Sequence, residues 1–173
     1  KGENMRIAVD GMGGDFAPQE IVKGAVEASR EIDDEIYILG FEDEIRRELK
    51  KYRFDSQKIK IVNCTEVITG EDSPAKAARA KKDSSMIKGL SLVKEGTCDM
   101  LISGGNTGAL MAGSLFILGR IKGIDRPCIG MTYPILGEGF SLLVDSGANA
   151  ECKPQNLMDF AMMGNLYMKG VFD

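Results

Sequence analysis

Short apolar runs alternate with amphipathic stretches along the whole chain. Runs rich in β-branched and large aliphatic residues at 6–10, 35–39, 58–62 and 100–102 are typical of buried strands. Helices are predicted to start at Pro18 and at the Ser-Pro pair 73–74, and helical spacing recurs at 43–52, after 83 and at 107–118. Two later runs, 128–133 and 140–144, are only six residues apart, which favours an antiparallel hairpin before a last helix from Pro154.

The alternation of strands and helices predicts an α/β protein whose sheet is mostly parallel. Ligands bind such sheets at the carboxyl ends of the strands, so we expect function in the loops at 10–16, 63–73, 103–108 and 145–153. A chain of 173 residues can bury one sizeable core. We expect the domain to begin at Met5, with residues 1–4 as an extension.

Composition removes several classes of function. The chain has no histidine, which excludes Ser-His-Asp and Cys-His catalysis and argues against catalytic zinc. A net charge of −4 argues against nucleic-acid binding, and 43% hydrophobic residues argue against disorder. The four cysteines are widely spaced without a Cys-x-x-Cys pair, which favours reduced thiols in a cytoplasmic protein. We expect neither a metal nor a cofactor.

The first glycine-rich loop, Asp10-Gly-Met-Gly-Gly-Asp15, follows the first predicted strand. A dinucleotide fingerprint starting at Gly11 would need glycine where Phe16 stands, and no Gly-Lys-Ser/Thr phosphate loop is present. The loop is therefore either a tight turn that requires glycine or part of a site bracketed by two carboxylates. The local sequence leaves both interpretations open.

The second glycine-rich loop, Ser103-Gly-Gly-Asn-Thr-Gly108, is the stronger candidate for a site. Glycine lets the backbone approach an anion closely, and the start of the following helix presents free N–H groups to it. Asn106 and Thr107 add side-chain donors and can also cap the helix. The alternative is a capped turn that packs tightly in a crowded core.

Two further segments carry polar groups that could bind a ligand. A basic cluster lies between the glycine loops, offset only by Asp83, and consists of Lys76, Arg79, Lys81, Lys82 and Lys88. It is either a solvated helix face or a docking patch for phosphate or an acidic partner. The turn at 145–149, followed by Cys-Lys-Pro at 152–154, either holds ligand or caps the final helix.

Taken together, these segments resemble the phosphate acyltransferase family of bacterial lipid synthesis, the PlsX type. The matching motifs lie at 7–15, 73–76, 82–86, 103–109, 120–127, 145–149 and 152–154. The resemblance implies a three-layer α/β/α sandwich akin to phosphotransacetylases and the isocitrate/isopropylmalate dehydrogenases. It also implies a reaction in which acyl-[acyl carrier protein] and inorganic phosphate give acyl phosphate and free carrier protein. The implied assembly is a cytoplasmic homodimer with peripheral membrane association.

This reaction can proceed without histidine, because phosphate is already ionised near neutral pH and a thiolate is a good leaving group. The residues that we expect to be catalytic are Asn106, Lys82 and Asp10. Those expected to dock the carrier protein are Arg79, Lys81 and Lys88. Those expected to bind phosphate or substrate are Gly11, Gly13, Gly14, Asp15, Lys76, Ser84, Ser85, Ser103, Gly104, Gly105, Thr107, Gly108, Asp145 and Asn149.

The chain departs from the family pattern at two places. Gly104 stands where the loop usually has alanine, and Asn63-Cys64 stand where members often carry His-Ala. The chain is also much shorter than members of the family, so we expect it to lack the C-terminal part of the fold and some of the site. Two other functions stay open: a short-chain acyl-CoA phosphate acyltransferase, and a catalytically silent fragment for dimerisation or membrane attachment.

Overall fold

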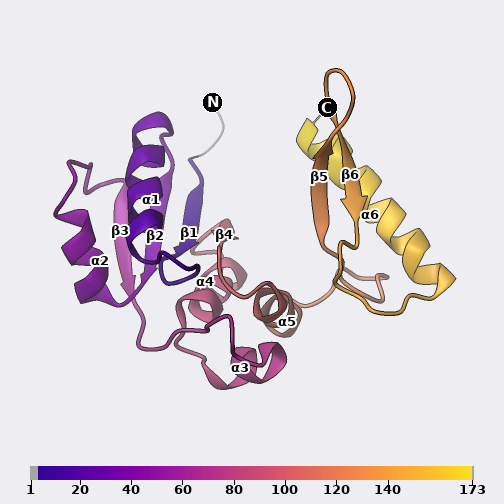
Figure 1. Ribbon diagram of the computed structural model, residues 1–173, viewed down its shortest axis with the longest axis horizontal. Helices are drawn as coiled ribbons and strands as arrows, with labels where there is room; N and C mark the ends of the chain where they lie inside the picture. Colours follow the sequence, from indigo (N-terminus) through magenta and orange to yellow (C-terminus); the bar gives the residue numbers. More distant parts are fainter. Residues whose placement is uncertain (1–3, 173) are drawn as a thin grey trace. The chain divides into compact units, whose positions relative to one another are not determined.

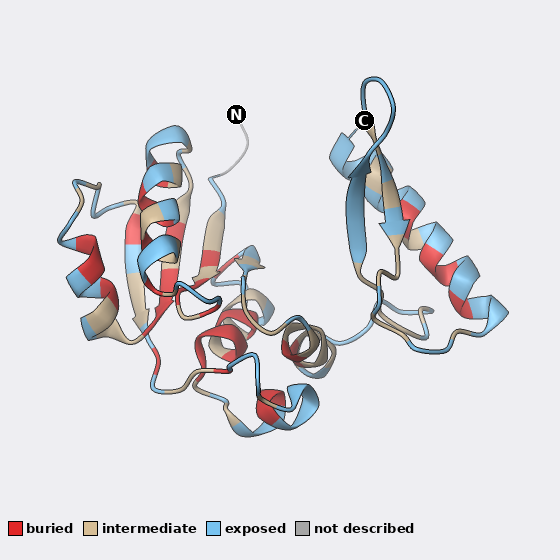
Figure 2. Ribbon diagram, viewed as in Figure 1, coloured by how far each residue is buried: buried red, intermediate tan, exposed pale blue. Residues whose placement is uncertain are grey.

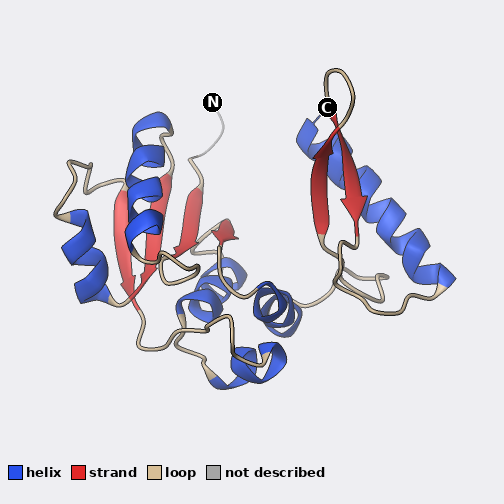
Figure 3. Cartoon of the chain, in the orientation of Figure 1, coloured by secondary structure: helices blue, strands red, loops and turns tan. Residues whose placement is uncertain are grey.

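The computed structural model describes residues 4–172 and divides the chain into two compact units. The first unit ends at Gly119 and the second begins at Arg120. Figures 1 and 3 show a strand-and-helix layered unit in the first part of the chain and a hairpin with one long helix in the second.

The first unit contains four parallel strands and five helices among its described residues. Their order is β1 (Arg6–Asp10), α1 (Gln19–Glu31), β2 (Glu35–Gly40), α2 (Glu42–Leu49), β3 (Ile59–Asn63), α3 (Pro74–Ala80), α4 (Ser85–Lys94), β4 (Met100–Ile102) and α5 (Thr107–Ile117). The strands pair in the order β3-β2-β1-β4. The predicted α/β class with a mostly parallel sheet is confirmed.

Side chains of β2 alternate between the two faces of the sheet, and helices cover both faces. Ile36 and Ile38 are buried in one cluster with residues of α1 and α2. Leu39 belongs to a second cluster with Ala8 of β1, against which the α4 residue Leu92 packs. The first unit therefore has the three layers expected of an α/β/α sandwich, and Figure 2 shows its buried residues concentrated on the sheet and the inner helix faces.

Helices α3 and α5 extend the α4 side of the first unit. A separate core cluster joins Ile68, buried alanines of α3 and α5, and the α4 residues Met86, Ile87 and Leu90. A Cβ atom at Gly113 of α5 would lie 2.8 Å from side-chain carbons of Ile87 and Leu90. Glycine at this position thus lets α5 approach α4 closely.

The second unit consists of β5 (Gly130–Pro134), β6 (Phe140–Val144) and α6 (Pro154–Phe172). The two strands pair antiparallel, which confirms the predicted hairpin. Gly164 of α6 lies over the hairpin, since a Cβ there would be 2.8 Å from Val144 Cγ2. The rings of Phe140 and Phe172 meet edge to face with centroids 4.3 Å apart. These contacts hold α6 against one side of the hairpin.

Two element boundaries differ from the prediction by two or more residues, for local reasons. The helix α2 ends at Leu49, because the amides of Lys51 and Tyr52 bond carbonyls three residues back and tighten the chain into a turn. The strand β5 starts at Gly130 instead of Cys128, since the Ile129 carbonyl accepts hydrogen bonds from the amides of Asp145 and Ser146 in the loop after β6.

Candidate functional site

The two glycine-rich loops come together at the carboxyl end of the sheet in the first unit. The strands β1 and β4 are neighbours and pair Val9 with Ile102, so the loops that follow them start side by side. A Cβ on Gly13 would lie 2.9 Å from the Gly105 nitrogen, and one on Gly104 would lie 3.2 Å from the Gly13 oxygen. The backbones of segments some 90 residues apart in sequence are therefore in direct contact, which only glycine allows here.

Asp10 lies beneath this contact and is buried, with 2% of its surface exposed. Its Oδ1 accepts a hydrogen bond from the Ser85 hydroxyl and one from the Met12 amide at 3.3 Å. Its Oδ2 accepts the Ser103 hydroxyl at 2.7 Å. The carboxylate thus connects both glycine loops to the first residue of α4.

Asn106 is the N-cap of α5 and is also bound to the loop before α3. Its Oδ1 accepts the Ala109 amide at 2.9 Å, and its Nδ2 donates to the carbonyls of Thr69 (3.1 Å) and Asp72 (3.3 Å). The amide hydrogens of Asn106, which were expected to contact substrate, therefore already have protein acceptors. The amides of Thr107 and Gly108, at the start of α5, have no acceptor within the helix.

The five residues of the basic cluster differ in their surroundings. Lys81 Nζ pairs with Asp72 at 2.6 Å, and Lys88 Nζ pairs with Asp83 at 2.7 Å. Arg79 stacks on the Phe116 ring, 4.5 Å from its centroid. Lys76 and Lys82 are exposed, and neither forms an ion pair within the described residues 4–172. Two of the three expected docking cations are thus bound within the protein.

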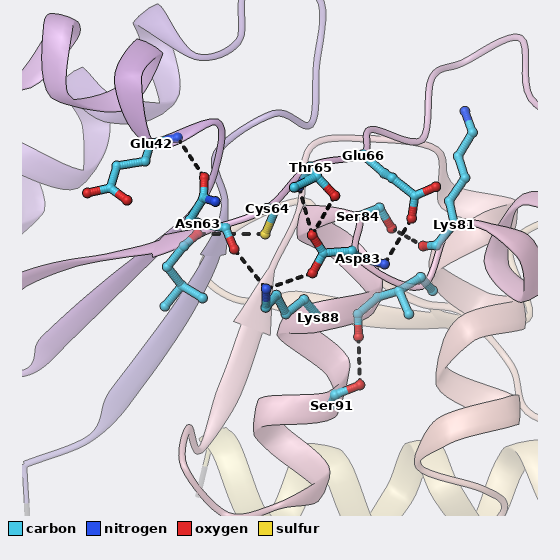
Figure 4. A network of polar contacts seen from close by, with 12 residues as sticks. Glu42, Asn63, Cys64, Thr65, Glu66, Lys81, Asp83, Ser84, Lys88 and Ser91 are labelled. Carbon is cyan, nitrogen blue, oxygen red and sulfur yellow. Dashed lines mark hydrogen bonds and ion pairs between the residues drawn. The ribbon is translucent and has the colours of Figure 1, made fainter.

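A polar network, drawn in Figure 4, attaches the loop after β3 to the start of α4. Asp83 accepts the Thr65 hydroxyl at 2.7 Å, and its own amide donates to Glu66 Oε2 at 3.0 Å. The Lys88 ammonium, followed by Thr65, holds the pKa of Asp83 below its usual value. Burial raises the pKa of the nearby Cys64 thiol to about 11. Sequence reasoning included Thr65 and Glu66 in the candidate loop 63–73 but gave neither residue a role, since neither lies in a recognisable motif.

The remaining predicted binding residues lie in several places. Ser84 is fully buried and donates to the Lys81 carbonyl, whereas Gly14 and Asp15 are exposed beside the first loop. Asp145 and Asn149 belong to the second unit, where the Asn149 amide donates to Asp145 at 2.9 Å and to the Pro127 carbonyl at 3.0 Å. Their bonds stabilise the loop after β6, in which Asp145 has a φ of 64°.

Two further features are absent from the described residues. Residues 4–172 contain no group of three or more Cys, Asp or Glu side chains arranged to hold a metal ion. Within the same range, none of the helices combines the length and the apolar character needed to cross a membrane.

Comparisons with known proteins place the chain in a family. The family model described as "Fatty acid synthesis protein" matches residues 5–173. The phosphate acyltransferase of Clostridioides difficile (strain 630) is 53% identical over 167 residues, which cover 96% of this chain and 49% of the relative. The phosphate acyltransferase of Alkaliphilus oremlandii (strain OhILAs) is 52% identical over 169 residues, covering 98% and 50%. The chain thus spans about half the length of these curated relatives.

Solved structures agree in fold. A phosphotransacetylase from Streptococcus pyogenes superposes with a TM-score of 0.68 at 22% identity, covering 91% of this chain and 51% of that one. The EutD phosphotransacetylase from Staphylococcus aureus gives a TM-score of 0.64 at 20% identity, again covering 91% and 51%. Identities this low support a shared fold only, whereas the family match extends over nearly every residue. This chain belongs to the fatty acid synthesis protein family.

Proposed function

We propose that this chain provides the phosphate-binding part of an enzyme that transfers an acyl group from acyl-[acyl carrier protein] to inorganic phosphate. The observation that carries the proposal is the backbone contact between the two glycine loops at the carboxyl end of β1 and β4, beside the free amides of α5. Backbone N–H groups at such a position favour an anion such as phosphate. The relatives named phosphate acyltransferase support the choice of reaction.

In the proposed reaction a phosphate oxygen attacks the carbonyl carbon of the thioester. A C–O bond forms, the C–S bond breaks, and the carrier leaves as a thiolate that takes a proton from water. The site must hold two anionic reactants in line and stabilise the oxyanion that develops on the carbonyl oxygen. Backbone amides and lysines can do both without an imidazole base.

Within this scheme the backbone amides of Thr107 and Gly108 are proposed to donate hydrogen bonds to phosphate. Lys76 and Lys82 are the proposed counter-charges, because both are exposed and without an ion pair in residues 4–172. Asn106 contributes mainly by capping α5 and holding the 69–72 loop, since its amide hydrogens are already bonded. The direct catalytic contact expected from the Asn106 side chain would require one of those bonds to break.

The test measures phosphate-dependent release of the carrier thiol by a full-length version of the protein. Lys82→Ala should raise the phosphate KM by roughly tenfold, the loss of one charge-assisted contact. Lys94→Ala, which removes an equally basic side chain from the end of α4, is the matched control and should leave the KM unchanged. Thiol release that does not depend on phosphate, or turnover of acetyl-CoA in preference to the carrier thioester, would refute the proposed reaction.

The carrier protein, which is acidic, is proposed to dock on the basic cluster. Lys81 and Lys88 are held by Asp72 and Asp83, so Arg79, with the neighbouring free lysines, is the cation best placed to meet it. Arg79→Glu should raise the KM for the carrier thioester and leave the KM for the same acyl group on pantetheine unchanged. Equal effects on both donors would contradict docking at this cluster.

Homodimerisation and peripheral attachment to the inner face of the cell membrane complete the proposal. Large apolar side chains are exposed on the second unit, among them Ile121, Leu136 and Leu166, and such surfaces often contact a partner or a membrane. Light scattering of the purified protein would detect the dimer. Flotation with anionic and with zwitterionic vesicles would detect membrane binding, and protein that stays at the bottom of both gradients would rule it out.

A further inference from the structure

Asp10 is a buried carboxylate that has no cation beside it. It is 2% exposed, and it forms no ion pair within residues 4–172. Removing a carboxylate from water is costly unless hydrogen bonds compensate for its lost hydration. Here the compensation comes from three donors, the hydroxyls of Ser85 and Ser103 and the Met12 amide.

These donors belong to three segments that are far apart in sequence. Met12 lies in the first glycine loop, Ser103 opens the second, and Ser85 is the first residue of α4. The Ser103 hydroxyl donates to Asp10 and accepts the Gly105 amide at 3.1 Å. Because the proton of Ser103 is directed at Asp10, the lone pairs of its oxygen are directed at Gly105, and the carboxylate thereby orients the backbone of the second loop.

Steric contacts reinforce this arrangement. A Cβ at Gly105 would lie 3.3 Å from Asp10 Oδ2 and 3.3 Å from the Gly13 Cα, so the carboxylate fills the space where the two loops meet. The Asp10 side chain is 2% exposed and packs against Gly13 and Gly105 of the two loops. Direct contact with the reacting atoms, the role expected from sequence, does not fit this burial.

We infer that Asp10 is a positioning residue: through the Met12 amide and Ser103 it fixes the separation of the two glycine loops, through Ser85 it anchors them to α4, and it so sets their affinity for phosphate. The inference rests on the proposed function for its phosphate readout. A residue that acts by placing the binding loops should change the phosphate KM more than kcat, since phosphate uses the same loop contacts in the ground state and the transition state.

The experiment has a structural arm and a kinetic arm. The structural arm uses this chain and measures amide exchange at Met12 and Gly105 by NMR. Asp10→Asn replaces one acceptor by a donor and forces the Ser103 hydroxyl to turn, so exchange at both amides should accelerate by about tenfold while β2 and β3 keep their protection. Ser103→Ala should accelerate exchange at Gly105. Ser91→Ala, which removes an α4 hydroxyl bonded to the Ile87 carbonyl, is the matched control and should change neither amide.

The kinetic arm uses a full-length version of the protein. Asp10→Asn should raise the phosphate KM by about tenfold or more and change kcat by less than about threefold. If Asp10→Asn does not fold, two serine variants supply the same readout. Ser85→Ala removes one hydrogen bond to Asp10, and Ser103→Ala removes its bond to Asp10 together with the one that it accepts from the Gly105 amide.

Distinct results would overturn the inference. Unchanged exchange at Met12 and Gly105 in Asp10→Asn would show that the carboxylate does not hold the loops. A large fall in kcat at constant phosphate KM would show that Asp10 acts on the reacting groups instead. If the unmodified protein releases no thiol in response to phosphate, the proposed function fails, and the exchange arm still decides whether Asp10 holds the loops.

Discussion

Gly13 is the position at which a single methyl group should most disturb the candidate site. A Cβ there would overlap Asp10 Oδ2 and lie 2.9 Å from the Gly105 backbone nitrogen. Neither neighbour is the free end of a flexible side chain, since Asp10 is fixed by three hydrogen bonds and Gly105 belongs to the opposite loop. Gly13→Ala must therefore separate the loops or displace the carboxylate.

The cost of Gly13→Ala has two parts. Overpacking a tight interior site costs about 1–3 kcal/mol. Loss of one hydrogen bond to a charged group costs about 1.5–3 kcal/mol, and partial relaxation makes the two parts less than additive. We expect a loss of about 2–4 kcal/mol, a large share of the 5–15 kcal/mol typical of a domain.

A matched control comes from Gly24, inside α1, where an added Cβ meets nothing within 4 Å. Gly24→Ala should stabilise the first unit by about 0.5–1 kcal/mol, because alanine loses less backbone entropy in a helix. Urea unfolding followed by amide-exchange mass spectrometry on β1 and β2 peptides reports the first unit alone. Gly13→Ala within 0.5 kcal/mol of the unmodified chain would refute the packing argument.

Three further predictions concern groups around the site. Cys64 and Cys98, both 1% exposed, should react with iodoacetamide at about pH 8 only after Cys128 and Cys152. At a pKa of about 11 only about one Cys64 thiol in a thousand is ionised at this pH. Mass spectrometry that finds Cys64 labelled first would contradict this order. Because the pKa of Asp83 lies below its usual value of 3.8, the ionised carboxylate stabilises the protein at pH values above 3.8, and this contribution disappears as the pH falls through the native pKa. Asp83→Asn should therefore flatten the acid side of the curve of stability against pH, by less than about 1 kcal/mol for so exposed a pair. An unchanged slope would count against the Lys88 contact. Asn106→Ala should destabilise the protein by about 1–2 kcal/mol through loss of the α5 cap. Thr107 is exposed, so Thr107→Ala should change the free energy of unfolding by no more than about 0.5 kcal/mol. Equal melting curves for the two variants would refute the capping role.

The period of the apolar residues was enough to predict most of the fold. In β2, Ile36 and Ile38 are buried on one face of the sheet and Leu39 on the other, and the continuous apolar run in the sequence predicts such a strand. The division of the chain after Gly119 could not be predicted in this way, because it depends on how few contacts cross that point and not on local composition. Element ends also depended on local hydrogen bonds, as at Leu49, that have no sequence signature.

The site could be predicted in parts but not as an arrangement. Glycine content indicated both loops, yet their contact depends on β4 pairing with β1, a choice that no local pattern encodes. In the sequence only Asp83 offsets the basic cluster, whereas folding brings Asp72 to Lys81 across the intervening helix α3. Charges that look free in a sequence can thus be neutralised by acids several residues away.

The charge of Asp10 provides a test of how the loops act on an anion. Its negative charge lies under loops proposed to bind phosphate, so Coulomb repulsion alone predicts that Asp10→Asn tightens phosphate binding. Loss of the Ser103 hydrogen bond predicts weaker binding instead. The direction of the KM change therefore separates the two effects. An increase that persists from low to high salt reflects loop geometry, because salt screens the charge term and leaves buried hydrogen bonds nearly unaffected.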